Sequence, residues 1–215
     1  MRKASQWEIP LILLGAVLLV LVFTSLVAKP YSIPSGSMES TLQVGDRVLV
    51  NRFVYHVRPI ERGDVVVFDG TDSFVPANGN GNPITGLLTA VGQSFGLLAP
   101  DGTDFVKRVI GVPGDSVQCC DAQGRLLVNG QALIEPYLYS GDHASTVAFN
   151  VIVPEGKLWV MGDHRSQSAD SRAHLGDPGG GMVSESKVIG RVMAVVWPPA
   201  HWGAVSIPDT YAKVS

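Results

Sequence analysis

The chain has 215 residues, of which 46% are hydrophobic and 16% are charged. This length and composition suffice for one globular core together with a membrane segment, and they exclude a disordered chain. A net charge of −3 and an isoelectric point near 5.9 leave no excess of basic residues for binding phosphates. The composition therefore argues against a nucleic-acid-binding protein.

The first predicted element is an apolar segment from Ile9 to Ala28, which contains no charged residue. About 20 such residues are enough for a helix to span the hydrocarbon of a bilayer. A cleaved secretory signal is the alternative, but its apolar region is shorter and ends in a small-x-small site. We therefore predict a transmembrane anchor over residues 9–28. Arg2 and Lys3, which precede this segment, favour a cytoplasmic N-terminus. We therefore predict a single-pass protein of the cell membrane, with residues 1–8 cytoplasmic and residues 29–215 extracytoplasmic.

Beyond the anchor, short alternating apolar runs separated by glycine and proline are typical of β-strands joined by turns. We predict strands at Arg47 to Phe53, Asp64 to Phe68, Phe105 to Val112, Arg125 to Val128, Leu158 to Met161 and Val188 to Val196. Asn129-Gly130 predicts a two-residue hairpin, because both residues tolerate positive φ. The expected fold is mainly β, with an antiparallel catalytic domain after one transmembrane helix.

Two segments are predicted to depart from this β core. Residues 70–103 contain an Asn- and Gly-rich stretch and lie between two predicted strands, which indicates a long excursion. A smaller insert is expected within about residues 118–157.

A serine and a lysine stand in contexts that favour catalysis. Ser37 belongs to the run Ser35-Gly36-Ser37-Met38, which begins seven residues after Ala28. Lys107 lies within an apolar run. A serine needs a base before it can attack a carbonyl carbon, and a desolvated lysine can lose its proton near neutral pH and become that base. Together these residues predict a membrane-bound serine/lysine protease.

Four motifs follow one another in the chain. The first two are Ile33-Pro34-Ser35-Gly36-Ser37-Met38 with Thr41-Leu42 and Gly45-Asp46, and Arg62-Gly63-Asp64-Val65-Val66-Val67-Phe68. The last two are Phe105-Val106-Lys107-Arg108 with Gly111-Val112-Pro113-Gly114-Asp115, and Met161-Gly162-Asp163-His164-Arg165 with Ser168-Ala169-Asp170-Ser171-Arg172. In content and order they closely resemble the motifs of bacterial type I signal peptidases. The resemblance covers the chain except residues 70–103 and 131–157.

This resemblance implies a role for each matching residue. Ser37 would attack the scissile carbonyl, and Lys107 would accept the serine proton. The backbone N–H of Ser37 and the hydroxyl of Ser35 would form the oxyanion hole. Ser168 would orient the neutral lysine. The loop that carries Ser168 would be supported by charged residues of the last motif, namely Asp163, Asp170 and Arg172.

The resemblance also implies a substrate. This would be a secretory preprotein whose signal segment lies in the same lipid bilayer, so that anchoring raises the effective concentration of both partners. Shallow pockets would accept small residues at the first and third positions before the cut, as in Ala-x-Ala. They would be lined by Ile33, Pro34, Ser35, Met38, Leu42, Phe105 and Val106. Neither a cofactor nor a metal is expected.

Two other functions remain open. A serine/lysine self-cleaving regulator would share the β fold and the catalytic pair, but such proteins usually carry a DNA-binding module where this chain has its predicted anchor. A non-enzymatic, membrane-anchored β domain would leave Ser35, Ser37, Lys107 and Ser168 without a role. The charged residues of the last motif also have a second interpretation, in which they form a solvated surface loop.

The histidines and cysteines do not favour another chemistry. The five histidines lack the context of a nucleophile elbow, and together with the cysteines they lack the paired spacing of metal ligands. Cys119 and Cys120 are adjacent, so they either form a vicinal disulfide or stay reduced.

The chain departs from the family pattern at two places. Ser40 replaces a common proline after the nucleophile, and His164, Ser166 and Gln167 replace the more frequent asparagine, aspartate and asparagine. These changes leave the proposed catalytic residues intact and affect only the expected stiffness and charge of the two loops.

Overall fold

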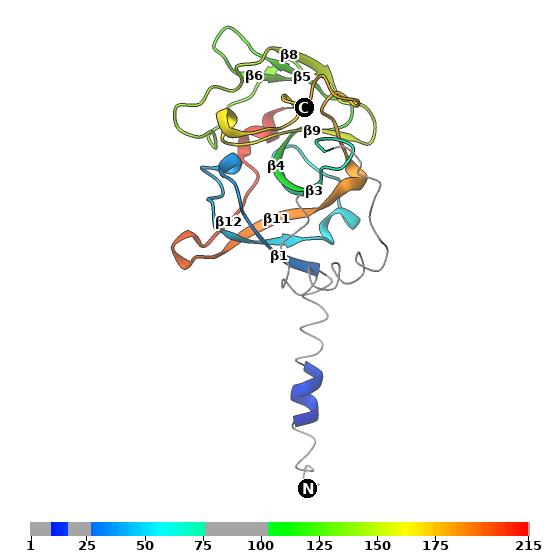
Figure 1. Cartoon of the computed structure of the whole chain (residues 1–215), viewed down its shortest axis with the longest axis vertical. Helices are drawn as coiled ribbons and strands as arrows, with labels where there is room; N and C mark the ends of the chain where they lie inside the picture. Colours follow the sequence, from blue (N-terminus) through cyan, green and yellow to red (C-terminus); the bar gives the residue numbers. More distant parts are fainter. Residues whose placement is uncertain (1–9, 17–26, 76–102, 215) are drawn as a thin grey trace.

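The computed structural model describes residues 10–16, 27–75 and 103–214. Twelve strands are defined within these ranges (Figure 1). They are β1 (Ala28–Ser32), β2 (Arg47–Asn51), β3 (Val65–Asp69), β4 (Asp104–Gly111), β5 (Ser116–Cys119), β6 (Leu126–Val128), β7 (Gln131–Ala132), β8 (Phe149–Ile152), β9 (Lys157–Met161), β10 (Val183–Ser184), β11 (Val188–Trp197) and β12 (Gly203–Ala204). Six 3₁₀ helices connect them: η1 (Gly36–Met38), η2 (Val54–His56), η3 (Arg165–Gln167), η4 (Glu185–Lys187), η5 (Pro199–His201) and η6 (Asp209–Lys213).

Eight strands form the larger sheet, in the order β1-β2-β11-β3-β4-β9-β10, with β12 paired to β11. The strand pairs within it are all antiparallel. All six strands predicted from the sequence are present, with ends that differ by a few residues. The prediction of a mainly β, antiparallel fold is therefore confirmed.

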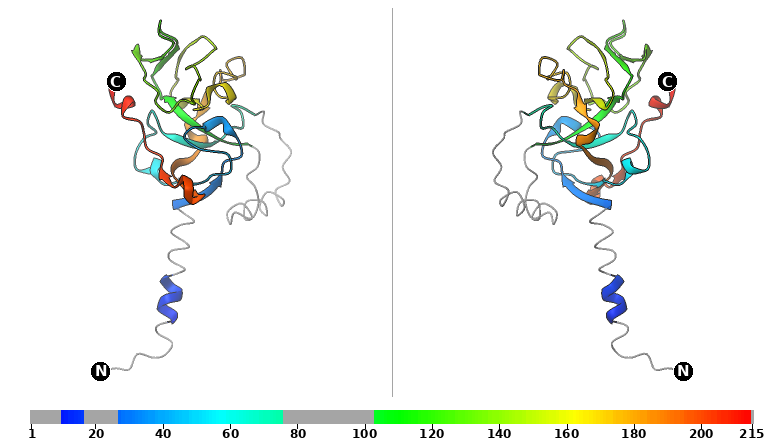
Figure 2. Two further views of the ribbon diagram at one scale, coloured as in Figure 1. Left: turned by 90° about the vertical axis from the view of Figure 1, so that its left-hand side faces the viewer. Right: turned by 90° about the vertical axis from the view of Figure 1, so that its right-hand side faces the viewer.

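The smaller sheet has four strands in the order β7-β6-β5-β8. Figures 1 and 2 show it at the end of the β domain opposite the described N-terminal helix. The predicted hairpin joins β6 and β7, and both turn residues have positive φ, 53° at Asn129 and 76° at Gly130. This sheet lies in the region of the predicted smaller insert.

The predicted membrane span lies mostly outside the described residues. Residues 10–16 are helical, whereas Ala28 belongs to β1 and pairs with Asn51 of β2. Pairing of the backbone with β2 therefore ends the predicted anchor before Ala28. Within residues 10–16, 27–75 and 103–214, no helix combines the length and the apolar character needed to cross a membrane.

Only the ends of the predicted excursion are described, because residues 76–102 lie outside the described ranges. Before them, Phe74 packs edge-on against Phe68 of β3 and Phe105 of β4, with ring centroids 5.4 Å apart in both cases. These rings attach the first residues of the excursion to the sheet.

Apolar side chains on the two faces of β3 enter different parts of the core. Val65 and Val67 belong to a cluster that includes the loop between β1 and β2. Val66 and Phe68 pack instead with residues of β4 and β9. Both faces of β3 and of its neighbour β4 are therefore covered by apolar side chains. A polar side chain on β4 is consequently shielded from water.

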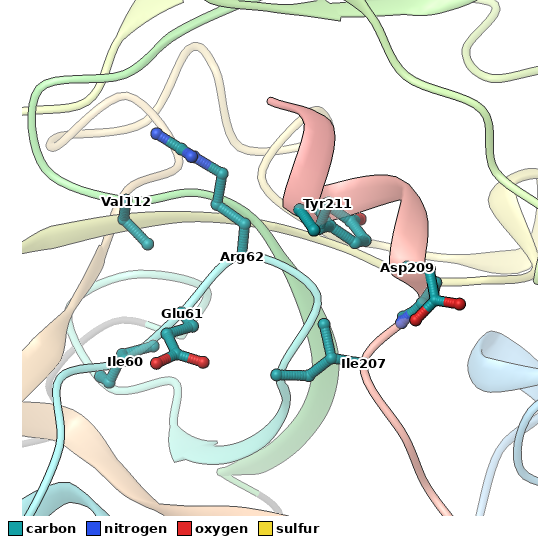
Figure 3. A pocket seen from close by; sticks show the side chains of 9 residues that line it. Ile60, Glu61, Arg62, Val112, Ile207, Asp209 and Tyr211 are labelled. Carbon is teal, nitrogen blue, oxygen red and sulfur yellow. The ribbon is translucent and has the colours of Figure 1, made fainter. Parts of the chain in front are cut away.

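A separate hollow of about 390 Å³ lies beside the C-terminal helix η6 (Figure 3). Figure 3 shows Ile60 and Arg62 on one side and Ile207 and Tyr211 on the other. Neither Ser37 nor Lys107 lines this hollow, so it is distinct from the predicted site.

Candidate active site

Ser37 lies in η1, in the loop that joins β1 to β2. The loop closes on itself through backbone hydrogen bonds, in which Ile33 donates to Asp46 and Gly45 donates to Ile33, each over 2.9 Å. Met38 is 1% exposed and Leu42 is fully buried, so apolar side chains fix the loop to the core immediately after the serine. Burial of these neighbours gives Ser37 a defined position.

Lys107 reaches Ser37 from β4, an interior strand that pairs with β3 and β9. The lysine is 4% exposed, and its Nζ lies 2.7 Å from Ser37 Oγ. The same Nζ donates to the carbonyl oxygen of Val106 over 3.1 Å. The structure thus brings together the serine and the lysine that the sequence singled out, 70 residues apart.

The environment of Lys107 favours the neutral amine. Burial lowers the pKa of Lys107 to about 8, while the carboxylates of Asp170 and Asp163 oppose this effect and the guanidinium of Arg172 adds to it. Relative to the ordinary value of 10.5, this corresponds to about 3 kcal/mol against the charged form. A lysine with this pKa can accept a proton from a serine at neutral to mildly basic pH.

Arg108, the next residue on β4, forms a buried ion pair with Asp163. Arg108 Nε donates to Asp163 Oδ1 over 2.8 Å, and Nη2 donates to Oδ2 over 2.6 Å. Nη1 donates to the carbonyl oxygen of Gly63 over 2.9 Å, and the hydroxyl of Thr41 also donates to Asp163. This network connects the strand of the lysine to the loop of the serine.

A second buried ion pair supports the turn after β9. Arg172 Nε and Nη2 donate to the two oxygens of Asp170, each over 2.8 Å, and Nη2 also reaches the carbonyl of Arg165. Asp170 in turn accepts the backbone N–H of Gly162 over 3.0 Å. Burial raises the pKa of Asp170, but the hydrogen bonds and charge of Arg172 outweigh this, and the net effect is a lowered pKa.

The alternative of a solvated loop is wrong for these charged residues. Asp163 and Asp170 are fully buried, Arg165 is 4% exposed and Arg172 is 8% exposed. Arg165 bonds the carboxylate of Glu135, a residue of the segment without recognised motifs. The sequence offered no signal for Glu135, because a single glutamate in an unmatched segment has no distinctive context.

Ser168 and Ser35 lie near the pair, but no hydrogen bond to it is defined for their hydroxyls. Ser168 Oγ is buried, and the Ser168 side chain helps to lower the pKa of Asp170 by hydrogen bonding. A Cβ placed on Gly162 would lie 2.3 Å from Ser168 Oγ and 2.5 Å from the carbonyl oxygen of Ser37, so Ser168 borders the serine loop. Ser35 is exposed at the start of η1 and makes no capping hydrogen bond.

The residues predicted to line the substrate pockets do not all gather in one place. Ile33, Met38, Leu42 and Val106 belong to the core cluster beneath the serine loop. Phe105 packs with the other cluster, and its ring lies 5.9 Å from that of Phe68. Pro34 is exposed. Ile33, Met38 and Leu42 are at most 3% exposed and support the serine loop from the core, so Val106 is the only one of the first four that is partly exposed, whereas Phe105 is directed toward the other cluster.

Both departures from the family pattern make contacts at the site. Ser40 Oγ donates to the carbonyl of Tyr137 over 3.2 Å. His164 Nδ1 lies 3.2 Å from a carboxylate oxygen of Glu39. The new side chains thus attach the two loops to neighbouring groups, which compensates for the stiffness that a proline would supply.

The cysteines and the candidate metal ligands can be assigned from the structure. Cys119 and Cys120 form a disulfide at the end of β5. Among the residues that the structure describes, no three His, Cys, Asp or Glu side chains are grouped so as to hold a metal ion. The arrangement of Ser37 and Lys107, with Oγ and Nζ 2.7 Å apart, is one that can support nucleophilic attack assisted by an amine base.

Comparison with known proteins identifies the family. The family model described as "Signal peptidase, peptidase S26" matches residues 6–197. A probable signal peptidase I of Mycobacterium leprae is 40% identical over 95% of this chain and 80% of its own length. Signal peptidase I of Bacillus amyloliquefaciens is 32% identical over 92% of this chain and 88% of its own length.

Among solved structures, a signal peptidase I from Enterococcus faecalis V583 aligns with 64% of this chain and 99% of that chain. The sequence identity is 26% and the TM-score is 0.42. The sequence matches, which extend over nearly the whole chain, show that this protein belongs to the signal peptidase family, peptidase S26, and is a serine peptidase.

Proposed function

We propose that this protein removes signal peptides from secretory preproteins, using Ser37 as nucleophile and Lys107 as general base. One observation carries the proposal: Ser37 Oγ and Lys107 Nζ are 2.7 Å apart in a buried setting that lowers the pKa of the lysine to about 8. A serine hydroxyl within hydrogen-bonding distance of a neutral amine is the arrangement that nucleophilic catalysis requires.

The reaction proceeds in two proton-coupled steps. Ser37 donates its hydroxyl proton to neutral Lys107 as Oγ bonds to the scissile carbonyl carbon, which gives a tetrahedral oxyanion. The protonated lysine then gives this proton to the leaving amine, and an acyl-enzyme forms. Water then attacks the acyl carbon while giving a proton to Lys107, and the protonated lysine returns this proton to Ser37 Oγ as the bond between Oγ and the acyl carbon breaks and the signal peptide leaves as a carboxylic acid.

Three serines divide the remaining tasks in this proposal. The backbone N–H of Ser37 and the hydroxyl of Ser35 stabilise the oxyanion, and the exposure of Ser35 at the start of η1 leaves its hydroxyl accessible to a substrate. Ser168, which borders the serine loop, orients the amine of Lys107. Asp163, Asp170 and Arg172 support this arrangement through the two buried ion pairs.

Substrate selection follows from the surface beside Ser37. Ile33, Met38, Leu42 and Val106 pack together in one cluster, which leaves little room above them. Depressions over this cluster would therefore be shallow and would accept small residues at the first and third positions before the cut. Pro34, which is exposed, completes the proposed surface, and Phe105, whose ring packs with the other cluster, is left out of it. Larger side chains at these two positions would clash, which gives the Ala-x-Ala preference.

The proposed setting is the cell membrane, with the segment that begins at residue 9 and ends before Ala28 as a single anchor, the N-terminus in the cytoplasm and the peptidase domain outside. The described part of this segment supports the proposal, because residues 10–16 are helical and Leu11, Ile12, Leu13 and Leu14 are 57–69% exposed. A turn of helix that exposes four large apolar side chains is suited to lipid rather than to water.

Cleavage of a defined precursor tests the proposal. The full chain in detergent is incubated with a precursor that carries Ala-x-Ala before the mature sequence, and with a matched precursor that has phenylalanine in place of the second alanine. We expect cutting after the second alanine of the first precursor alone, and no cutting by Ser37→Ala. Equal cleavage of both precursors, or cleavage by Ser37→Ala, would contradict the proposal.

A further inference from the structure

His164 holds the nucleophile loop at two points. Its backbone N–H donates to the carbonyl oxygen of Ser37 over 3.1 Å. Its imidazole Nδ1 lies 3.2 Å from Glu39 Oε2, and the histidine side chain is only 5% exposed. Residue 164 is therefore in contact with the nucleophile itself and with the residue two positions after it.

Glu39 extends this contact to the other side of the serine. Its backbone N–H donates to the carbonyl of Gly36 over 3.1 Å. Its carboxyl group also lies over Gly36, because a Cβ placed on that glycine would be 3.1 Å from the Glu39 carboxyl carbon. Gly36 and Ser37 are therefore held between the Glu39 side chain and the loop that carries His164.

The opposite face of the imidazole is covered by the segment that precedes β8. The ring of Tyr139 stacks on His164 with centroids 3.8 Å apart and an angle of 13° between the planes. Tyr139 is itself fixed by its backbone N–H, which donates to the carbonyl of Asp163 over 3.1 Å. The stacking leaves the imidazole little freedom to turn away from Glu39.

The charged groups around His164 are mostly acidic. Glu39 faces it from the nucleophile loop, and Asp142 faces it from the segment of Tyr139, where it accepts the backbone N–H of Ser166 over 3.1 Å. Arg165 follows in sequence but is paired with Glu135. An imidazole with a proton on Nδ1 can donate to Glu39 whether or not Nε2 is also protonated, so the contact does not require a charged histidine.

We propose that Glu39 and His164 are positioning residues that keep Ser37 Oγ within reach of Lys107 Nζ. Neither residue contacts the reacting atoms. They act by fixing the backbone on both sides of the nucleophile, and small displacements of a nucleophile cost much of its rate. The proposal rests on the role of Ser37 proposed above. It assigns a function to a glutamate and a histidine at positions where the family motif did not indicate one.

Kinetics of four single variants test this proposal on the Ala-x-Ala precursor. We expect His164→Ala and Glu39→Ala each to lower kcat about tenfold with KM within about twofold, because the substrate surface is unchanged. His164→Asn and Glu39→Gln should retain kcat within about threefold, since an amide can replace either partner in the hydrogen bond. The double alanine variant should be no slower than the slower single variant, since both changes remove one interaction.

His174→Ala is the matched control. His174 also stacks on an aromatic ring, that of Phe74 at 4.5 Å, and its Nδ1 lies 2.7 Å from Asp177 Oδ2. We expect its kcat to be unchanged. A second readout does not depend on turnover: amide hydrogen exchange at His164 should be about tenfold faster in Glu39→Ala than in the unaltered chain, if the pair stabilises its bond to Ser37.

Three results would overturn the proposal: unchanged kcat in both alanine variants, an equal loss in His174→Ala, or unchanged amide exchange at His164 in Glu39→Ala. Failure of the unaltered chain to cut the precursor would instead contradict the proposed function, and the exchange measurement would still decide whether the pair fixes the loop.

Discussion

Lys107 and Arg108 are adjacent cations on one strand, both almost completely buried, yet their environments have opposite effects. Arg108 bonds both oxygens of Asp163, and this pairing raises its pKa despite the burial. Lys107 bonds a hydroxyl and a carbonyl, and burial lowers its pKa to about 8. Burial combined with a carboxylate partner gives a permanent charge that supports structure. Burial without a bonded carboxylate gives an amine that can exchange a proton.

The geometry of β4 explains how one strand can carry both a permanently charged arginine and a lysine that can exchange a proton. Successive side chains of β4 point to opposite faces, so Lys107 can reach the serine loop while Arg108 reaches the turn after β9. The pairing of Val66 with Lys107 and of Val65 with Arg108 fixes this register. A slip of one residue would exchange the two cations and remove the base from the nucleophile.

The largest expected effect comes from removing the base. Lys107→Met replaces the amine with an apolar side chain of similar length, so Ser37 has no proton acceptor. We expect kcat/KM for the Ala-x-Ala precursor to fall at least about 10⁴-fold, as measured by initial rates over a range of enzyme concentrations. Arg108→Lys is the comparison, because it keeps a cation at the neighbouring position and leaves the base in place. Substantial activity of Lys107→Met would show that another group accepts the proton.

Removing the neighbouring cation should act on stability instead. Arg108→Met leaves the Asp163 carboxylate buried without its main partner, and we expect the free energy of unfolding to fall by about 3–5 kcal/mol in denaturant titrations. Lys187→Met is the matched control, since the Lys187–Asp69 pair is about one third exposed and should contribute under about 1 kcal/mol. Equal losses in the two variants would refute the distinction between buried and surface pairs.

The third prediction concerns the cost of burying the lysine. Its pKa is lower in the folded chain than in the unfolded chain, so between about pH 8 and 10.5 the unfolded chain binds more protons. The free energy of unfolding should therefore rise with pH across this window. At pH 7 Lys107 is charged in both states, so keeping the charged amine buried costs the folded chain the full amount of about 3 kcal/mol. We expect Lys107→Met to be up to about 3 kcal/mol more stable at pH 7, while inactive.

Parallel denaturant titrations at pH 7 and pH 10 measure this effect. The advantage of Lys107→Met over the unaltered chain should be largest at pH 7 and should shrink toward pH 10. A variant that is destabilised at pH 7 would mean that the amine contributes more through its contacts than it costs through its charge.

The smallest expected effect belongs to Ser168. Its hydroxyl is buried and borders the serine loop, so its proposed task is to orient the amine of Lys107. Ser168→Ala should lower kcat roughly tenfold, about the contribution of one hydrogen bond, with little change in the free energy of unfolding. A loss as large as that of Lys107→Met would make Ser168 a direct participant in proton transfer, and an unchanged kcat would remove its orienting role.

The sequence allowed six of the twelve strands to be predicted, and it singled out Ser37 and Lys107, which the structure places side by side, because alternation and local motifs carry that information. Residues 47–51, 65–69 and 188–197 show regular apolar patterns and were predicted within a few residues. Two-residue strands such as β10 and β12 have too few residues for any pattern and were missed. β1 was not predicted, because its first residue, Ala28, continues the apolar segment that precedes it.

The partners of the buried charges were harder to predict than the charges. Glu135 pairs with Arg165 and Tyr139 stacks on His164, yet both lie in a segment without recognised motifs. These contacts depend on how the smaller sheet and its loops fold back onto the turn after β9, which is long-range information. Local sequence therefore singled out the two groups that we propose to react, but not all the residues that hold them.

The most direct test of this account is the pKa of Lys107 in the folded chain. The chain is prepared with ¹³C at the lysine Cε position, the Lys107 signal is assigned by its absence from Lys107→Met, and its shift is followed by NMR from pH 6 to 11. We expect a transition near pH 8, well below the ordinary lysine value of 10.5. A Lys107 signal that titrates near 10.5 would contradict the claim that burial without a bonded carboxylate makes this lysine the base.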